Sequence, residues 1–365
     1  MSQPISGSSP GGSHRLEHLD SLRGIAAFGV AFHHCCYSFS GIPHNEYLYD
    51  LTGQSAVVFF FLLSGFVLSR SLAKEGALEG PGLAGYYIRR FWRIAPALIV
   101  AIIFSALAAR LYLLPTDVSS ATEWLQRVIF KAQSVTGIRG YLNSFLLANR
   151  DLDPPLWTIV IELIGSFLLP LLALLLRRFP PLSMSVGLLI VLFSFKSTGH
   201  PRYYIAPLFG FYLGYLLQRA EPFLHTISTR MTEWLLFFTL LVWVYSLRGG
   251  FDYVAHTIIL AALLALLIPC NIPNLRTFLR SGPLKFLGKI SYSFYLLSLP
   301  IILLTYSAIE YFWPTVLPLE PHLIPAVILF LISLIPTILI SALSERFLES
   351  TGNRLGQRLA QRWAR

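Results

Sequence analysis

The sequence carries little charge for its length. Only 13% of its 365 residues are Asp, Glu, Lys or Arg, whereas 55% are hydrophobic, and the mean hydropathy is +0.63. Typical soluble domains carry about 25% charged residues, because much of a soluble surface must be polar. This composition excludes an ordinary soluble domain, a disordered chain and a coiled coil. It predicts an integral membrane protein, in which the net charge of +10 reflects topology and no nucleic-acid partner is expected.

Cysteine is also scarce, and its placement excludes a disulfide framework. Cys35 and Cys36 are adjacent, and Cys270 lies far along the chain. The run from His33 to Cys36 does not predict a metal site, because four successive helical residues point in different directions. No phosphate-binding loop or dinucleotide-binding fingerprint occurs, so neither ATP nor NAD is a predicted ligand.

Apolar runs long enough to cross a hydrocarbon core of about 30 Å recur along the whole chain. They predict an all-α, polytopic membrane bundle of about ten transmembrane helices. The predicted spans are 22–40, 54–72, 94–114, 155–176, 183–196, 202–219, 233–247, 253–270, 287–310 and 322–347. No internal repeat is visible, which weakens an interpretation as an inverted-repeat transporter.

The distribution of basic residues predicts the orientation of the bundle. Twenty of the 28 Lys and Arg residues fall in the two tails and the even-numbered connections, which places both termini in the cytoplasm. Residues 1–14 lack the features of a cleaved signal peptide and are expected to form a disordered tail. The membrane domain is expected over 15–350, followed by a basic tail over 351–365. Part of the outer connection 115–154 is amphipathic and is expected to lie on the membrane surface.

Ionisable side chains inside two predicted spans are candidates for function, because such groups are costly in a membrane. In the first span Asp20, Arg23 and His34 share one helical face, and the eleven steps from Arg23 to His34 correspond to about 16 Å. Glu162 lies among aliphatic residues of the fourth span. Residue counting places His34 and Glu162 roughly 10 Å below the outer surface, so we expect them to meet as an acid/base pair. The alternatives are a His34 that only bonds a carbonyl and a Glu162 that is a neutral packing group.

Arginines before the third span form a second candidate site. Arg90 and Arg93 are three residues apart and share a helical face at the cytoplasmic boundary. One interpretation is a plain topological signal. The other is a clamp for phosphates, which suit the guanidinium fork, and its expected ligand is a nucleotide-containing donor such as a coenzyme A thioester.

Small and hydroxyl-bearing residues in two other spans have less specific meanings. In the second span Ser64 and Gly65 predict close helix packing more strongly than a catalytic serine. Tyr295 belongs to a group of hydroxyls in the ninth span, which could join helices or line a substrate path.

Five segments resemble, in order, those of the acyltransferase 3 family of integral membrane acyltransferases. LDSLRGIAAFGVAFHH resembles the opening helix of that family, and Arg23 and His34 match its Arg or Lys to His motif. FFFLLSGFVLSRS, YIRRFWRIAP, LWTIVIE and LGKISYSFYLLSLP are similar to later segments of the family. Two positions differ: Thr158 replaces a frequent Ser, and Ser298 replaces a late His, which puts any role of that His in doubt here.

The resemblance implies an enzyme that moves an acyl group, with acetyl favoured, from cytoplasmic acyl-CoA to a hydroxyl of a glycan or lipid-linked sugar. The expected location is the inner membrane of a bacterium, and all of the chemistry is expected from the membrane domain. The residues expected to carry it are His34 as general base, Glu162 as its orienting partner, Arg23, Arg90 and Arg93 at the donor, and Asp20, Ser64, Trp157 and Tyr295 along the substrates. No metal is expected, and a homo-oligomer is left open.

Two other function classes fit the same residues. A proton-coupled transporter or flippase would use Asp20, Arg23, His34 and Glu162 as a relay. A non-enzymatic membrane subunit would use them only to join helices. The absence of a visible repeat and the arginine pair favour the enzyme.

Overall fold

The computed structural model describes residues 16–42, 45–73, 77–116, 121–179, 200–250 and 252–363, with single positions at 185 and 189. These residues form no strand beyond one isolated bridge between Phe39 and Ala121, which agrees with the predicted all-α class. The α-helices are α1 (Glu17–Tyr37), α2 (Asn45–Leu48), α3 (Ser55–Leu72), α4 (Gly80–Ala108), α5 (Glu123–Ser134), α6 (Gly137–Phe145), α7 (Leu156–Arg178), α9 (His200–Leu224), α10 (Thr229–Ser246), α11 (Tyr253–Leu267), α12 (Pro273–Leu279), α13 (Gly282–Phe312), α14 (Leu323–Ser344) and α15 (Ser350–Trp363). Short π-helical segments, η1 (Tyr49–Gln54) and η4 (Glu345–Glu349), precede α3 and follow α14, and 3-10 turns occupy η2 (Leu247–Gly249) and η3 (Pro314–Val316).

Five helical stretches among the described residues are long and apolar enough to cross a membrane. They are Tyr49–Leu72, Gly80–Ala108, Leu156–Arg178, Gly282–Phe312 and Leu323–Trp363. These stretches correspond to the second, third, fourth, ninth and tenth predicted spans. The first, sixth, seventh and eighth predicted spans fall in α1, α9, α10 and the shorter apolar helix α11. The fifth, 183–196, lies outside the described residues except at two positions, so the number ten stays a prediction.

The outward faces of these helices are apolar. On α14, Leu331, Ile335, Leu339 and Leu343 follow one another at four-residue intervals, and each is more than half exposed. Residues spaced in this way share one helical face. A continuous exposed apolar face on a well-packed helix indicates contact with lipid. The structure therefore supports a multi-pass membrane protein.

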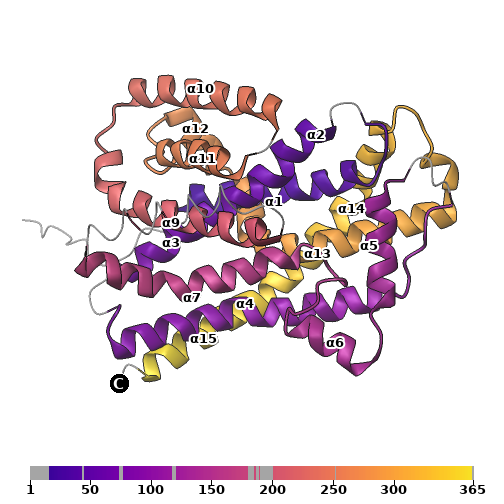
Figure 1. The fold of residues 1–365 in the computed structure, drawn as a ribbon, viewed down its shortest axis with the longest axis horizontal. Helices are drawn as coiled ribbons and strands as arrows, with labels where there is room; N and C mark the ends of the chain where they lie inside the picture. The colour runs from indigo at the N-terminus through magenta and orange to yellow at the C-terminus, as the bar shows by residue number, and fades with distance from the viewer. Residues whose placement is uncertain are drawn as a thin grey trace, which may run out of the picture.

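The long helices lie mainly along one axis of the molecule, and α5 runs across one end of it (Figure 1). Helices α1 and α13 run parallel. Glu17 pairs with Lys285 at 3.6 Å near their starts, and the rings of Phe39 and Tyr306 lie 6.2 Å apart near the other end. This agrees with the prediction that the first and ninth spans cross in the same direction.

Helices α3 and α7 run opposite to α1. The start of α3 follows Gly53, which lies against the ring of His33 near the end of α1. At its other end, the carbonyl of Leu72 accepts a 2.9 Å hydrogen bond from Arg177 at the end of α7. The helix directions thus follow the predicted alternation of the first, second and fourth spans.

Two close backbone contacts set the positions of the helices around the site. A Cβ atom at Gly24 on α1 would lie 2.6 Å from the backbone nitrogen of Gly288 on α13, so glycine is required for this approach. A Cβ at Gly65 on α3 would lie 2.3 Å from the carbonyl oxygen of Phe211 on α9. Each glycine follows a site residue, Arg23 or Ser64, and this fixes where those side chains project.

We call the end of the bundle where α1, α4 and α13 begin the basic end. Its basic side chains include Arg70, Arg89, Arg90, Arg93, Lys285 and Lys289. The last described helix, α15, reaches one end of the long axis (Figure 1). The segment predicted as a basic tail, 351–365, is a helix up to Trp363, and it packs along the first half of α4.

Candidate functional site

Two cavities share a wall near the basic end. The narrow cavity has a volume of about 90 Å³ and is lined by Arg23, Val57, Phe60, Phe61, Ser64, Arg90, Arg93, Ile94, Thr158, Ile159, Glu162, Ser291, Tyr292 and Tyr295. The vestibule has a volume of about 760 Å³, and its charged lining residues are Asp20, Arg23, Arg70, Arg89, Arg90, Arg93, Lys289, Glu345 and Glu349. Both are lined by Arg23, Arg90, Arg93, Ser291 and Tyr292. A ligand could therefore extend from the vestibule past the arginines into the narrow cavity.

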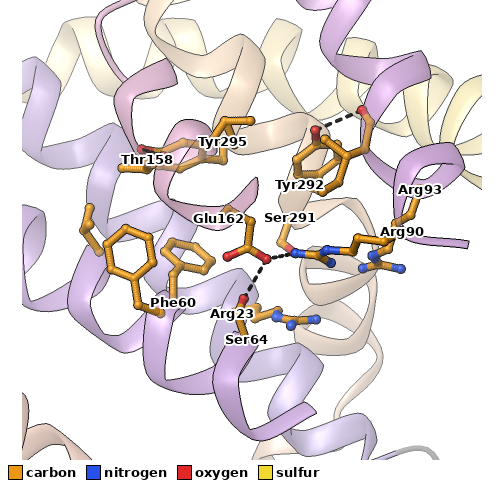
Figure 2. A pocket seen from close by; sticks show the side chains of 14 residues that line it. Arg23, Phe60, Ser64, Arg90, Arg93, Thr158, Glu162, Ser291, Tyr292 and Tyr295 are labelled. Carbon is orange, nitrogen blue, oxygen red and sulfur yellow. Dashed lines mark hydrogen bonds and ion pairs between the residues drawn. The ribbon is translucent and has the colours of Figure 1, made fainter. Parts of the chain in front are cut away.

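Glu162 is the acidic side chain of the narrow cavity. Its carboxylate accepts a 3.0 Å hydrogen bond from the Ser64 hydroxyl and forms an ion pair with Arg90 (Figure 2). Arg90 also donates from Nε to the hydroxyl of Ser166 at 2.9 Å, one turn further along α7. The side chains of Arg90 and Glu162 are 12% and 17% exposed, so the pair is largely buried. Glu162 therefore holds Arg90 in place.

The other arginines give this wall an excess of positive charge. Arg23 lies 3.7 Å from Asp20, one turn earlier on α1. Arg93 lines both cavities. It forms no ion pair with any carboxylate among the described residues. Three guanidinium groups thus face one carboxylate in the narrow cavity. Such an arrangement favours an anionic ligand.

Hydroxyl groups line the side of the narrow cavity formed by α13. Tyr292 donates to the carbonyl of Ile94 at 3.0 Å, which ties α13 to α4 (Figure 2). Tyr295 and Thr158 share a 2.9 Å hydrogen bond between α13 and α7. Of the residues predicted to contact substrate, Tyr295 and Ser64 line this cavity and Asp20 lines the vestibule.

His34 lies elsewhere, nearer the other end of α1. It lines neither cavity, it is 9% exposed, and its ring stacks on Trp124 of α5 with centroids 5.9 Å apart. Its Nδ1 atom has no hydrogen-bond partner among the described residues. Glu162 instead faces Arg90 in a cavity that Arg23 also lines, and Arg23 is about 16 Å from His34 along the helix. The structure does not bring His34 and Glu162 together.

An aromatic cluster that we did not predict surrounds the two histidines. The ring of Tyr49 lies 4.7 Å from His33, and Tyr37 lies 5.4 Å from His33 and 5.2 Å from Trp124. Tyr37, Tyr49 and Trp124 are each partly exposed. No periodicity could have revealed this cluster, because its members come from α1, η1 and α5.

Asp153, in the loop before α7, is a buried carboxyl group to which no pattern in the sequence pointed. It is 1% exposed, and neither of its oxygens has a hydrogen-bond partner among the described residues. Burial raises its pKa well above the usual range, because the charged form loses its hydration.

The remaining predicted positions lie outside the two cavities. Trp157 packs on Phe61 with ring centroids 6.2 Å apart and lines neither cavity. Ser298, at the position of the family's late His, donates to the carbonyl of Tyr295 within α13 at 3.2 Å. The described residues contain no group of three or more His, Cys, Asp or Glu side chains suited to a metal ion.

Comparison with known proteins agrees with the resemblance in sequence. The chain is 30% identical to "Protein 2 in picA locus" from Rhizobium radiobacter, over 40% of this chain and 76% of that protein. It is 31% identical to "Nodulation protein 10" from Rhizobium leguminosarum bv. viciae, over 46% of this chain and 48% of that protein. No solved structure matches. A sequence model of the acyltransferase 3 family, described as an acyltransferase domain, matches residues 16–346, and the chain therefore belongs to that family of acyltransferases.

Proposed function

We propose that the protein transfers an acyl group, with acetyl favoured, from cytoplasmic acyl-CoA to a hydroxyl group of a glycan or lipid-linked sugar. The observation that carries this proposal is the wall shared by the two cavities. A wide, basic vestibule suits the phosphates of the donor, and a narrow, mostly apolar cavity suits its slender acyl-bearing arm.

The arginines have separate roles in this proposal. Arg93 and Arg23 bind the phosphates where the vestibule meets the narrow cavity. Arg90 shares that wall, but its ion pair with Glu162 already balances its charge. We therefore assign Glu162 to positioning Arg90, in place of the role of orienting His34 that its predicted depth suggested. The basic end would face the cytoplasm, where acyl-CoA is present.

His34 is proposed as the general base for the acceptor. The acceptor hydroxyl would give its proton to His34 while its oxygen attacks the thioester carbonyl. The new carbon–oxygen bond forms as the carbon–sulfur bond breaks, and the thiolate of coenzyme A leaves and takes up a proton. The acyl end of the donor must then extend beyond Arg23 toward the end of α1 that carries His34. The partly exposed rings of Tyr37, Tyr49 and Trp124 suit the faces of a sugar acceptor approaching from that end.

The proposed location is the inner membrane of a bacterium, with both termini in the cytoplasm. Both relatives come from species of Rhizobium. The relay needed by a transporter would require His34 next to Glu162, and the structure separates them, so the enzyme is favoured.

Donor binding tests the central observation. The protein in lipid nanodiscs is dialysed against radiolabelled acetyl-CoA, and the affinity of the parent is compared with that of Arg93→Ala. Loss of a charged contact to phosphate should weaken binding by about tenfold or more. If Arg93→Ala bound acetyl-CoA as tightly as the parent, the proposed donor site would be wrong.

The matched control is Lys285→Ala. Lys285 lies at the same end of the bundle but pairs with Glu17 and lines neither cavity. Its removal should leave acetyl-CoA affinity within about twofold of the parent, since exposed ion pairs contribute little. For the catalytic step, His34→Ala should bind acetyl-CoA normally and fail to transfer label to surface glycans. Transfer at the parental rate would refute the base assignment.

A further inference from the structure

One face of α15 lines the vestibule. Ser350, Asn353 and Gln357 all border this cavity, and their spacing of three and then four residues places them on one side of the helix. The small residues Gly352 and Gly356 are buried on another side, against α4. The helix that follows the last membrane span is therefore a wall of the vestibule as well as a packing element.

The close approach of α15 to α4 brings these polar groups beside the arginines. A Cβ at Gly352 would lie 2.2 Å from the carbonyl oxygen of Trp92, and one at Gly356 would lie 3.3 Å from the Cα of Arg89. Asn353 and Gln357 each follow one of these glycines directly, and Arg93 follows Trp92. The vestibule thus has amide groups on α15 next to guanidinium groups on α4.

The amides have capacity for a ligand. Ser350 already donates to Glu345 at 2.6 Å, whereas the side chains of Asn353 and Gln357 make no hydrogen bond with any described residue. A side-chain amide offers a donor and an acceptor side by side, which matches the N6 amino group and N7 of adenine. Neighbouring guanidinium groups match phosphates. A ligand that carries adenine close to several phosphates satisfies both sets of groups.

We propose that α15 binds the adenine end of the acyl-CoA donor, with Asn353 and Gln357 contacting the base and Arg89 joining Arg93 and Arg23 at the phosphates. This inference rests on the proposed function and specifies the part of the donor that each wall of the vestibule recognises. The acyl-bearing arm then points away from α15, past Arg23 and Arg90, into the narrow cavity. The residues that recognise adenine, on α15, are therefore different from the residues that lie nearest to the thioester, in the narrow cavity.

Two donors test this assignment: acetyl-CoA, and S-acetyl-4′-phosphopantetheine, which lacks the whole 3′-phospho-AMP portion and keeps one phosphate and the acyl-bearing arm. Binding of acetyl-CoA and of S-acetyl-4′-phosphopantetheine is measured for the parent and for the double variant Asn353→Ala/Gln357→Ala in nanodiscs. The variant should bind acetyl-CoA about tenfold more weakly, because two amide contacts are lost. Its affinity for S-acetyl-4′-phosphopantetheine should stay within about twofold of the parent. Unchanged acetyl-CoA affinity, or an equal loss for both donors, would overturn the assignment.

The controls separate this inference from folding and from the proposed function. Gln361→Ala removes an exposed amide of α15 that does not line the vestibule, and it should leave both affinities unchanged. Gln357→Glu changes an exposed position, so folding is preserved, and its added charge should weaken acetyl-CoA binding more than Gln357→Ala does. If Arg93→Ala loses acetyl-CoA binding but the amide variants do not, the donor site stands and only the adenine assignment fails.

Discussion

Replacing Glu162 by Ala should make the protein markedly easier to unfold, because Arg90 is then left buried without its carboxylate. The two side chains are 12% and 17% exposed, so little water can replace the lost partner. Removing one member of a buried ion pair costs about 3–5 kcal/mol. We expect a loss of about 3 kcal/mol in the free energy of unfolding, since some exposure remains.

The variant Glu162→Gln distinguishes the contribution of the Glu162 charge from that of its hydrogen bond with Ser64. The amide oxygen can still accept from Ser64, so this variant should lose about 1–2 kcal/mol. The double variant Arg90→Ala/Glu162→Ala removes both charges. It should be at least about 1 kcal/mol more stable than Glu162→Ala, because no unpaired charge stays buried.

Unfolding by sodium dodecyl sulfate in mixed micelles, followed by tryptophan fluorescence, measures these differences. The control is Glu123→Ala, which removes an acid 3.6 Å from Arg127 on the exposed face of α5. Exposed pairs of this kind contribute at most about 0.5 kcal/mol. Equal unfolding free energies for Glu162→Ala and Glu123→Ala would refute the structural role of the buried pair.

Two further predictions concern other parts of the fold. Gly24→Ala should lower the free energy of unfolding by about 1–3 kcal/mol, because the added Cβ would lie 2.6 Å from the Gly288 backbone nitrogen. The shift needed to relieve this contact should displace Arg23 and weaken acetyl-CoA binding. The control is Gly282→Ala, where a Cβ meets nothing within 4 Å. Asp153→Asn should raise the thermal unfolding temperature at pH 8 and change it little at pH 4. The pKa of Asp153 is higher in the folded protein than in the unfolded chain. The parent therefore loses stability as the pH rises from the unfolded-state pKa through the folded-state pKa. The amide of the variant stays uncharged, so the variant does not lose this stability. A difference that is equal at both pH values would contradict this explanation.

The positions of most long helices and their directions across the bundle could be predicted from the sequence, because both follow from local patterns of apolar and basic residues. Long apolar runs give the spans, and the three-residue spacing of Arg90 and Arg93 gives a shared face. The parallel course of α1 and α13 follows from counting spans. The start of α4 at Gly80, well before residue 94, could not be predicted this way. The first half of α4 packs against α15 and is not a long apolar run. A search for apolar runs therefore finds only the second half of this helix.

The partner of Glu162 could not be predicted for a different reason. Residue counting assumes that two helices begin at the same level and cross the membrane at similar tilts. The level of α7 is set by its contacts with α3 and α4, which bring Glu162 to Ser64 and Arg90. For residues 351–365 the sequence predicts only a basic tail, and neither the helix α15 nor its contact with α4 was predicted.

The contact between Gly24 and Gly288 also bears on the order of assembly. Helix α1 is synthesised before α13, and it carries Asp20 and Arg23 in its first two turns. Its most extensive neighbour, α13, is synthesised only after all the helices from α2 to α12. Until then, both cavities lack the wall that carries Ser291 and Tyr292. Both cavities can therefore form only after α13 has been inserted, and a chain cut short before α13 would leave Arg23 at the membrane without the helix that encloses it.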